Sequence, residues 1–172
     1  MVPSPHTGLG RMIGILLAMF LPTLGIDFLF NAGILAHFYL HPGPAMLPVH
    51  LLMRRIPYGY ASILITVGFE LWLIYRLDVR GAFAGAKFGA MVGFVMGAAG
   101  ALGLFSVLPL GIDYLFGMAV CQVVEYAISG AIGGYGLGSG SVLKPFVIGL
   151  AVLLVGIVAG LAIQVTSGTS IS

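Results

Sequence analysis

Three acidic side chains lie inside stretches of the sequence that are otherwise apolar. They are Asp27, Glu70 and Glu125. A charged side chain at the centre of a membrane helix costs about 2.5–3.5 kcal/mol on the insertion scale, and no Lys or Arg is expected at the same depth as these acids. The three carboxyl groups are therefore expected to be protonated, to share protons or to meet a cation. Groups of this kind mark proton and ion pathways in membrane proteins.

Each of the three acids belongs to a polar stripe with helical spacing, because residues three or four positions apart share a helix face. The stripes are Thr23, Asp27 and Asn31; Ser62, Thr66 and Glu70; and Gln122, Glu125 and Ser129. We therefore predict that the acids turn towards other helices and bind protons, with Asn31, Thr66 and Gln122 as supporting ligands. The alternative is a structural role, in which neutral acids form hydrogen bonds between helices worth about 0.6 kcal/mol each.

Five apolar segments must position these acids. Hydrophobic residues make up 60% of the 172 residues and charged residues 7%, whereas a soluble domain has about 25% charged residues. A helix needs about 20 apolar residues to cross a bilayer core of about 30 Å. The predicted spans are 12–37, 58–76, 84–106, 111–134 and 145–165. The composition excludes a soluble enzyme, a disordered chain and a nucleic-acid-binding protein, and it predicts an all-α transmembrane bundle that forms one domain in the lipid bilayer.

The segments between the spans carry further expectations. Pro22 lies within the long first span and predicts a kink or tilt there. Residues 45–58 are too short and too proline-rich to cross, and apolar residues beside Arg54 and Arg55 predict a short segment in the headgroup plane. The glycine-rich residues 133–141 are expected to form a flexible loop.

The Lys and Arg residues predict an orientation. One side of the membrane would hold Arg11, Arg76, Arg80, Lys87 and Lys144, and the other would hold Arg54 and Arg55. Because loops rich in Lys and Arg stay in the cytoplasm, the N-terminus is expected to be cytoplasmic and the C-terminus exterior.

Glycine recurs at every fourth position at the start of the third predicted span, at Gly81, Gly85, Gly89, Gly93 and Gly97. Each glycine would destabilise a helix in water by about 1 kcal/mol. In a membrane, the same spacing lets a second helix approach to backbone distance. The partner helix can belong to this chain or to a second copy, so both internal packing and a homo-oligomer or larger membrane complex remain open.

Two histidines are weak candidates for metal binding. His37 and His41 have the spacing of one helix face, and neutral imidazole is a good transition-metal ligand. The chain has only four histidines, so anchoring at the membrane interface is the alternative. The glycine-rich GGYGLGSG stretch lacks the Lys-Ser/Thr end of a phosphate-binding loop. No cofactor is expected, and no motif supports catalysis.

Residues 27–39 (DFLFNAGILAHFY), followed by Lys87-Phe88-Gly89 and Val123-Val124-Glu125-Tyr126, resemble small bacterial inner-membrane families of unknown function. The resemblance covers about residues 20–135 and implies a compact bundle of four or five spans, with no activity to carry over. From this resemblance and from the three acids described above, we expect an inner-membrane protein that moves a proton, cation or small solute through a carboxylate-lined interior. The alternative is a non-catalytic membrane subunit or assembly factor that docks through the glycine face of the third span.

Overall fold

The computed structural model describes residues 8–168 except 42 and 44. Their helices are α1 (Leu9–Phe28), η1 (Leu29–Ile34), α2 (Ala36–Leu40), α3 (Val49–Arg76), α4 (Ala82–Val107), α5 (Ile112–Ser139) and α6 (Leu143–Ser167). The π-helix η1 continues directly from α1. Within the described residues, five helical segments are long and apolar enough to cross a membrane, with α1 and η1 counted as one. The prediction of an all-α membrane bundle is confirmed, and the chain is a multi-pass membrane protein.

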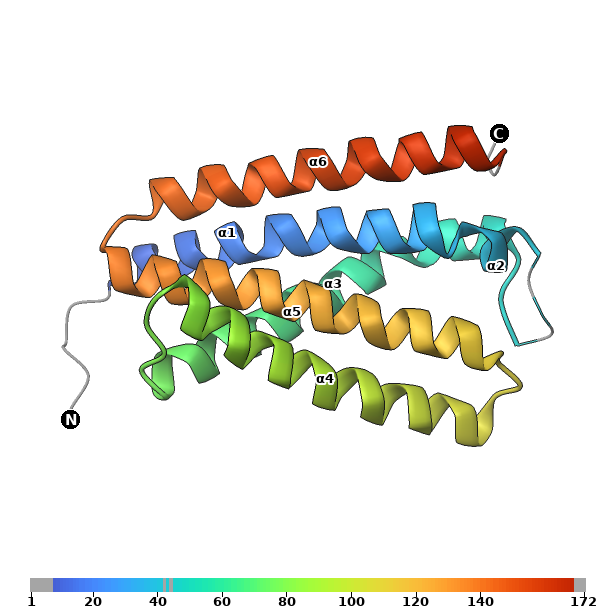
Figure 1. Ribbon diagram of the computed structural model, residues 1–172, viewed down its shortest axis with the longest axis horizontal. Coiled ribbons are helices and arrows are strands. Elements are labelled where there is room, and N and C mark those ends of the chain that lie inside the picture. Colours follow the sequence, from blue (N-terminus) through green and yellow to red (C-terminus); the bar gives the residue numbers. More distant parts are fainter. Residues whose placement is uncertain (1–7, 42, 44, 169–172) are drawn as a thin grey trace.

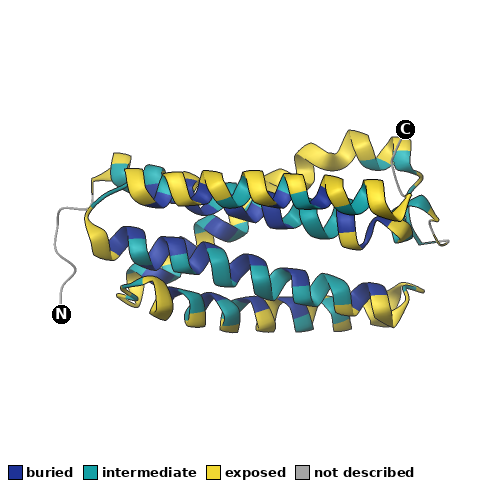
Figure 2. Ribbon diagram, turned by 45° about the horizontal axis from the view of Figure 1, so that its top comes forward, coloured by how far each residue is buried: buried dark blue, intermediate teal, exposed yellow. Residues whose placement is uncertain are grey.

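Successive spans run in opposite directions, so the two ends of the described chain lie at opposite ends of the bundle (Figure 1). Helix α6 lies along α1, and α4 lies along α5, while α5 also packs against α1. Buried residues line the inward faces of these helices, and exposed residues follow their outer faces (Figure 2). Because α5 contacts α1, α3 and α4, its side chains meet those of most other spans.

Glycines allow α4 and α5 to pack at backbone distance. Gly85, Gly89, Gly93 and Gly97 are all buried on α4. A Cβ on Gly89 would overlap the carbonyl oxygen of Tyr126, and one on Gly93 would lie 2.6 Å from that of Gln122. The glycine face of α4 is therefore covered by α5 of the same chain, and a partner protein docking there would have to displace α5.

A second glycine seam joins α6 to the first span. Gly149, Gly156 and Gly160 are buried on α6. On the facing helix, a Cβ on Gly25 would lie 2.6 Å from the Cα of Leu153. Small residues at such an interface increase van der Waals contact between backbones, which drives helix association in lipid.

The helices differ from the predicted spans at three places. The first is the π-helix η1 within the first span; helix α1 itself continues through the buried Pro22, and the kink or tilt expected there stays a prediction. Helix α3 begins at Val49 and continues through Pro57, so residues 49–57 extend the second span instead of forming a separate segment. A proline removes only one backbone donor, and membrane helices tolerate this loss.

The third difference is the glycine-rich stretch, which is not a loop up to Ser139. Residues 133–139 form the last turns of α5. Gly133 packs against Met19 of α1, Gly136 packs against Ile15, and Gly134 packs against Gly85 of α4. The expectation of a flexible loop was wrong because these close contacts outweigh the weak helix propensity of glycine.

Candidate functional site

The carboxyl group of Glu70 is enclosed by α3, α4 and α5. Its side chain is 0% exposed, and Ser129 of α5 donates a hydrogen bond from Oγ to Oε2. The other oxygen, Oε1, has no hydrogen-bond partner among the described residues. A Cβ on Gly89 or Gly130 would lie only 2.7 or 2.9 Å from this oxygen. The glycine seam between α4 and α5 therefore makes the room that the Glu70 carboxyl group occupies.

Glu125 lies one helical turn before Ser129 on α5. It is 6% exposed, and the buried Cys121 donates a weak hydrogen bond from Sγ to its Oε1 at 3.4 Å. The Asp27 carboxyl group of α1 is close enough for its charge to interact with that of Glu125. Two acids from antiparallel helices thus face the same part of the bundle interior.

Asp27 is held by a hydrogen-bond chain whose direction is fixed. The Asn31 amide donates to the Asp27 carbonyl oxygen at 3.2 Å and to Asp27 Oδ1 at 2.8 Å, so its oxygen is left to accept from Tyr39 Oη at 2.6 Å. Because the single Tyr39 hydroxyl proton is used there, the 3.1 Å contact between Tyr39 and Tyr114 must have Tyr114 as donor. All donors in this chain therefore point towards Asp27.

Tyr39 lies beyond the first span, on the short helix α2. Burial raises the pKa of the Tyr39 phenol above its ordinary value. The phenol therefore stays protonated and continues to donate to Asn31. Its ring also packs edge-on against Tyr114 of α5, with 6.0 Å between ring centroids, so α2 is fixed to the first turn of α5.

Side-chain hydrogen bonds also stabilise the π-helix η1 and the backbone beside it. A π-turn leaves carbonyl groups without their usual α-helical donors, and polar side chains can satisfy them. Gln164 of α6 donates from Nε2 to the Ala32 carbonyl oxygen at 2.6 Å, and Asn31 serves Asp27 in the same way. The irregular backbone beside Asp27 is therefore stabilised by Gln164 of α6 and by Asn31 of η1 itself.

The remaining residues of the predicted polar stripes on α3 and α5 do not all lie beside the acids. Thr66 interacts with the hydroxyl group of the buried Tyr126, which lies near both Glu70 and Glu125. Gln122 instead packs against α4, with its Cβ 3.4 Å from the Cβ position of Gly97. Ser62 is exposed, so the polar stripe of α3 turns inward only from Thr66 onwards.

His37 and His41 lie in an exposed position at the end of α2. The His41 backbone N–H donates to the His37 carbonyl oxygen at 3.1 Å, and the His37 ring packs on Phe38. Over the described part of the chain, no group of three or more His, Cys, Asp and Glu side chains could hold a metal ion.

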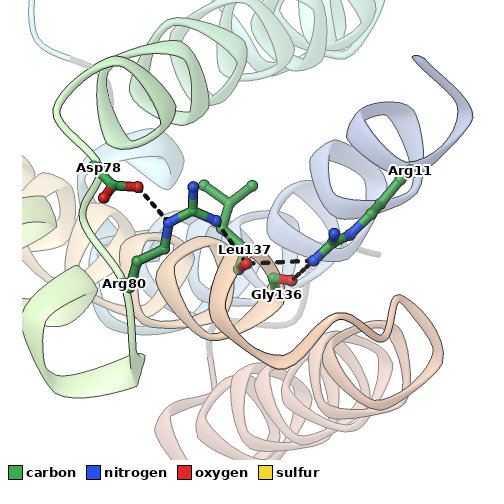
Figure 3. A network of polar contacts seen from close by, with 5 residues as sticks. All are labelled: Arg11, Asp78, Arg80, Gly136 and Leu137. Atoms are coloured by element: carbon green, nitrogen blue, oxygen red, sulfur yellow. Dashed lines mark hydrogen bonds and ion pairs between the residues drawn. The ribbon is translucent and has the colours of Figure 1, made fainter. Parts of the chain in front are cut away.

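Two arginines bind the carbonyl groups near the end of α5 (Figure 3). Arg11 of α1 donates to the Gly136 oxygen at 3.0 Å and to the Leu137 oxygen at 3.3 Å. Arg80 donates to the Leu137 oxygen at 2.7 Å and forms an ion pair with Asp78 at 2.6 Å. Cations near a helix C-terminus favourably complement the helix dipole, so these contacts fasten the α3–α4 loop and the start of α1 to α5.

Tyr114 and Cys121 were not predicted as site residues, although α5 carried a signal for them. They precede Glu125 and Ser129 at spacings of seven, four and four residues, which keeps all four on one helix face. Tyr39 and Arg11 had no such signal, because their partners are distant in the sequence. No protein-family model, curated protein or solved structure matches this chain, so its function is inferred from this geometry.

Proposed function

We propose that this multi-pass membrane protein moves protons across its membrane through the carboxyl groups of Asp27, Glu125 and Glu70. The observation that carries the proposal is the fully buried Glu70 carboxyl group, one oxygen of which is unpaired within the described residues. An unsatisfied buried polar atom costs about 1–3 kcal/mol. A purely structural acid is expected to pair both oxygens. The unpaired oxygen is better explained by a group that gains and loses a proton.

The surroundings of Glu70 favour a proton over a larger cation. Its Oε1 atom is packed against the backbones of Gly89 and Gly130, and its other oxygen binds Ser129. Oxygen-ligated cations such as Ca²⁺ need six to eight ligands at about 2.3–2.6 Å. A proton needs only one oxygen, so it suits this site best.

The three acids follow one another along the bundle. Glu125 and Ser129, the partner of Glu70, are four residues apart on α5, which corresponds to about 6 Å along the helix. Asp27 interacts with Glu125 from the facing helix α1. The Thr66–Tyr126 hydroxyl pair lies beside Glu70 and Glu125. This order supports proton transfer between Asp27, Glu125 and Glu70.

The proposed membrane is the bacterial inner membrane, with the N-terminus in the cytoplasm. Helices α1, α3, α4 and α6 start or end at one end of the bundle, and that end carries five basic residues: Arg11, Arg76, Arg80, Lys87 and Lys144. Arg54 and Arg55 lie on the first turns of α3, at the other end. Because cytoplasmic ends are enriched in Lys and Arg, this difference supports the proposed orientation.

Proton flux into liposomes tests the proposal. Purified protein is reconstituted with a trapped pH-sensitive dye, and a potassium diffusion potential drives proton entry. We expect the wild-type protein to acidify the lumen faster than empty liposomes, and Glu70→Gln and Glu125→Gln to abolish the difference. Asp113→Asn is the matched control, because Asp113 is an exposed acid on the first turn of α5, and its flux should equal that of the wild type.

Two results would contradict proton transport. One is wild-type flux in both Gln variants, with each variant shown to be folded by its elution from a size-exclusion column. The other is a wild-type protein that acidifies no faster than empty liposomes. The second result would leave the role of a non-catalytic membrane subunit, which would have to bind its partner through a surface other than the covered glycine face of α4.

A further inference from the structure

A hollow at the basic end of the bundle is separate from Asp27, Glu70 and Glu125. It has a volume of about 650 Å³ and lies between the α3–α4 loop and the first turns of α4. Its walls are apolar and charged, with Arg80, Phe83, Lys87, Phe88 and the acid Asp78 among the lining residues. Small-molecule sites typically measure about 300–1,000 Å³ and combine apolar walls with a few polar groups. We propose that this hollow binds an anionic phospholipid, with its phosphate group at Lys87 and Arg80.

Lys87 has the position that a phosphate-binding lysine needs. It is exposed and lies five residues after the start of α4, which corresponds to about 8 Å along the helix. A lysine at that depth reaches for the headgroup region while its stem stays in apolar surroundings. Its Nζ atom lies 6.0 Å from the centroid of the Phe83 ring, one turn nearer the end of the bundle. The ammonium group is thus directed towards the depth at which lipid phosphates lie.

The loop that forms the other wall is held in place. Arg80 is fixed by Asp78 and by the Leu137 carbonyl oxygen (Figure 3), and the Gly81 N–H donates to the Gly134 oxygen at 2.9 Å. Gly81 has a φ of +90°, which favours glycine and lets the chain turn from the loop into α4. The guanidinium group of Arg80 has five donors, and these contacts leave some of them available to a phosphate.

The charge of this end favours an anionic lipid over a zwitterionic one. Five basic residues gather there, with Asp78 as the acid paired to Arg80. Clusters of basic residues at the cytoplasmic ends of membrane helices bind anionic headgroups, and the orientation proposed above places this end in the cytoplasm. The exposed side chain of Phe83 provides an apolar wall for an acyl chain beside the phosphate.

Native mass spectrometry of the full chain in neutral detergent tests the lipid site. The protein is mixed with equal amounts of phosphatidylglycerol and phosphatidylcholine, and we expect it to retain phosphatidylglycerol preferentially. Lys87→Gln should weaken this retention about fivefold, the usual effect of one lysine near an anionic membrane surface. Lys87→Arg should retain the lipid, and Phe83→Ala should weaken retention without a change in charge. Lys144→Gln is the matched control, because it removes an exposed charge at the same end outside the hollow.

Three outcomes would overturn the proposal. Equal retention of the two lipids would show that charge does not select the ligand. An equal loss of phosphatidylglycerol retention in Lys87→Gln and Lys144→Gln would indicate general electrostatic attraction to the basic end instead of a binding site. Displacement of phosphatidylglycerol by an equal concentration of inorganic phosphate would indicate a site for free anions. A Lys87→Gln protein that elutes as the wild type does shows that any loss of lipid is not a loss of fold.

Discussion

Gly93 lies where α4 packs at backbone distance on α5, and no acid of the site is among its neighbours there. A Cβ at this position would lie 2.6 Å from the Gln122 carbonyl oxygen and 2.9 Å from the Val123 Cα. Ordinary contacts of a Cβ begin at 3.4 Å. In the Gly93→Ala variant, α4 would therefore have to move away from α5 by roughly 0.8 Å. The obstructing atoms belong to the α5 backbone and cannot rotate aside. The substitution must therefore separate the two helices along their glycine seam.

The cost of this separation can be estimated and measured. Overpacking a core typically costs about 1–3 kcal/mol, and a backbone obstruction places Gly93→Ala in the upper half of that range. Since 1 kcal/mol shifts the Tm of a protein of this size by about 2–4 °C, we expect the Tm to fall by about 4–12 °C. Cys121 is the only cysteine in the sequence and is buried, so the rate of its reaction with a fluorogenic maleimide during heating reports unfolding.

Gly100→Ala is the matched control for this measurement. Gly100 lies on the same helix, and no atom lies within 4 Å of its Cβ position. Its Tm should stay within about 2 °C of the wild-type value, because alanine there meets no neighbour and has a higher helix propensity than glycine. A Gly93→Ala protein as stable as the wild type, or an equal loss in Gly100→Ala, would refute the close packing of α4 on α5.

Three further predictions concern the polar contacts around Asp27. Gln164→Leu removes the donor to the Ala32 carbonyl oxygen and should lower stability by about 1–3 kcal/mol; an unchanged Tm would show that η1 does not need this contact. Tyr114→Phe removes one hydrogen bond to Tyr39 and should cost about 1 kcal/mol, whereas a loss above about 3 kcal/mol would indicate a larger role for Tyr114. Because the pKa of Tyr39 is raised, its phenol should stay protonated up to about pH 10, the ordinary pKa of a tyrosine. Phenolate absorbance up to that pH should be the same in Tyr39→Phe and the wild type, and a smaller rise in the variant would contradict this expectation.

The sequence was sufficient for the number and approximate limits of the spans. Apolar length is a local property, so each segment could be recognised without its neighbours. The sequence was misleading where tertiary contacts overrode local preference. The glycines at 133–136 look like a loop in isolation, yet they form helix because Ile15 and Met19 pack directly on them.

The candidate site was only partly predictable for the same reason. Helical spacing indicated that Glu70 and Glu125 turn inward, and both are buried. It could not indicate that Ser129 would bind Glu70 from another helix, because that pairing depends on how α3 and α5 cross. Nor could it predict η1, the π-helix that follows Asp27, because the contact that supports it comes from α6.

Infrared difference spectroscopy of the reconstituted protein tests most directly whether the buried acids hold protons. Protonated carboxyl groups have a C=O stretching band that carboxylates lack. At pH 7 we expect the wild type to show such bands, and we expect Glu70→Gln and Glu125→Gln each to remove one, while Asp113→Asn leaves them unchanged. A wild-type spectrum at pH 7 with carboxylate bands alone would contradict a proton path through these acids.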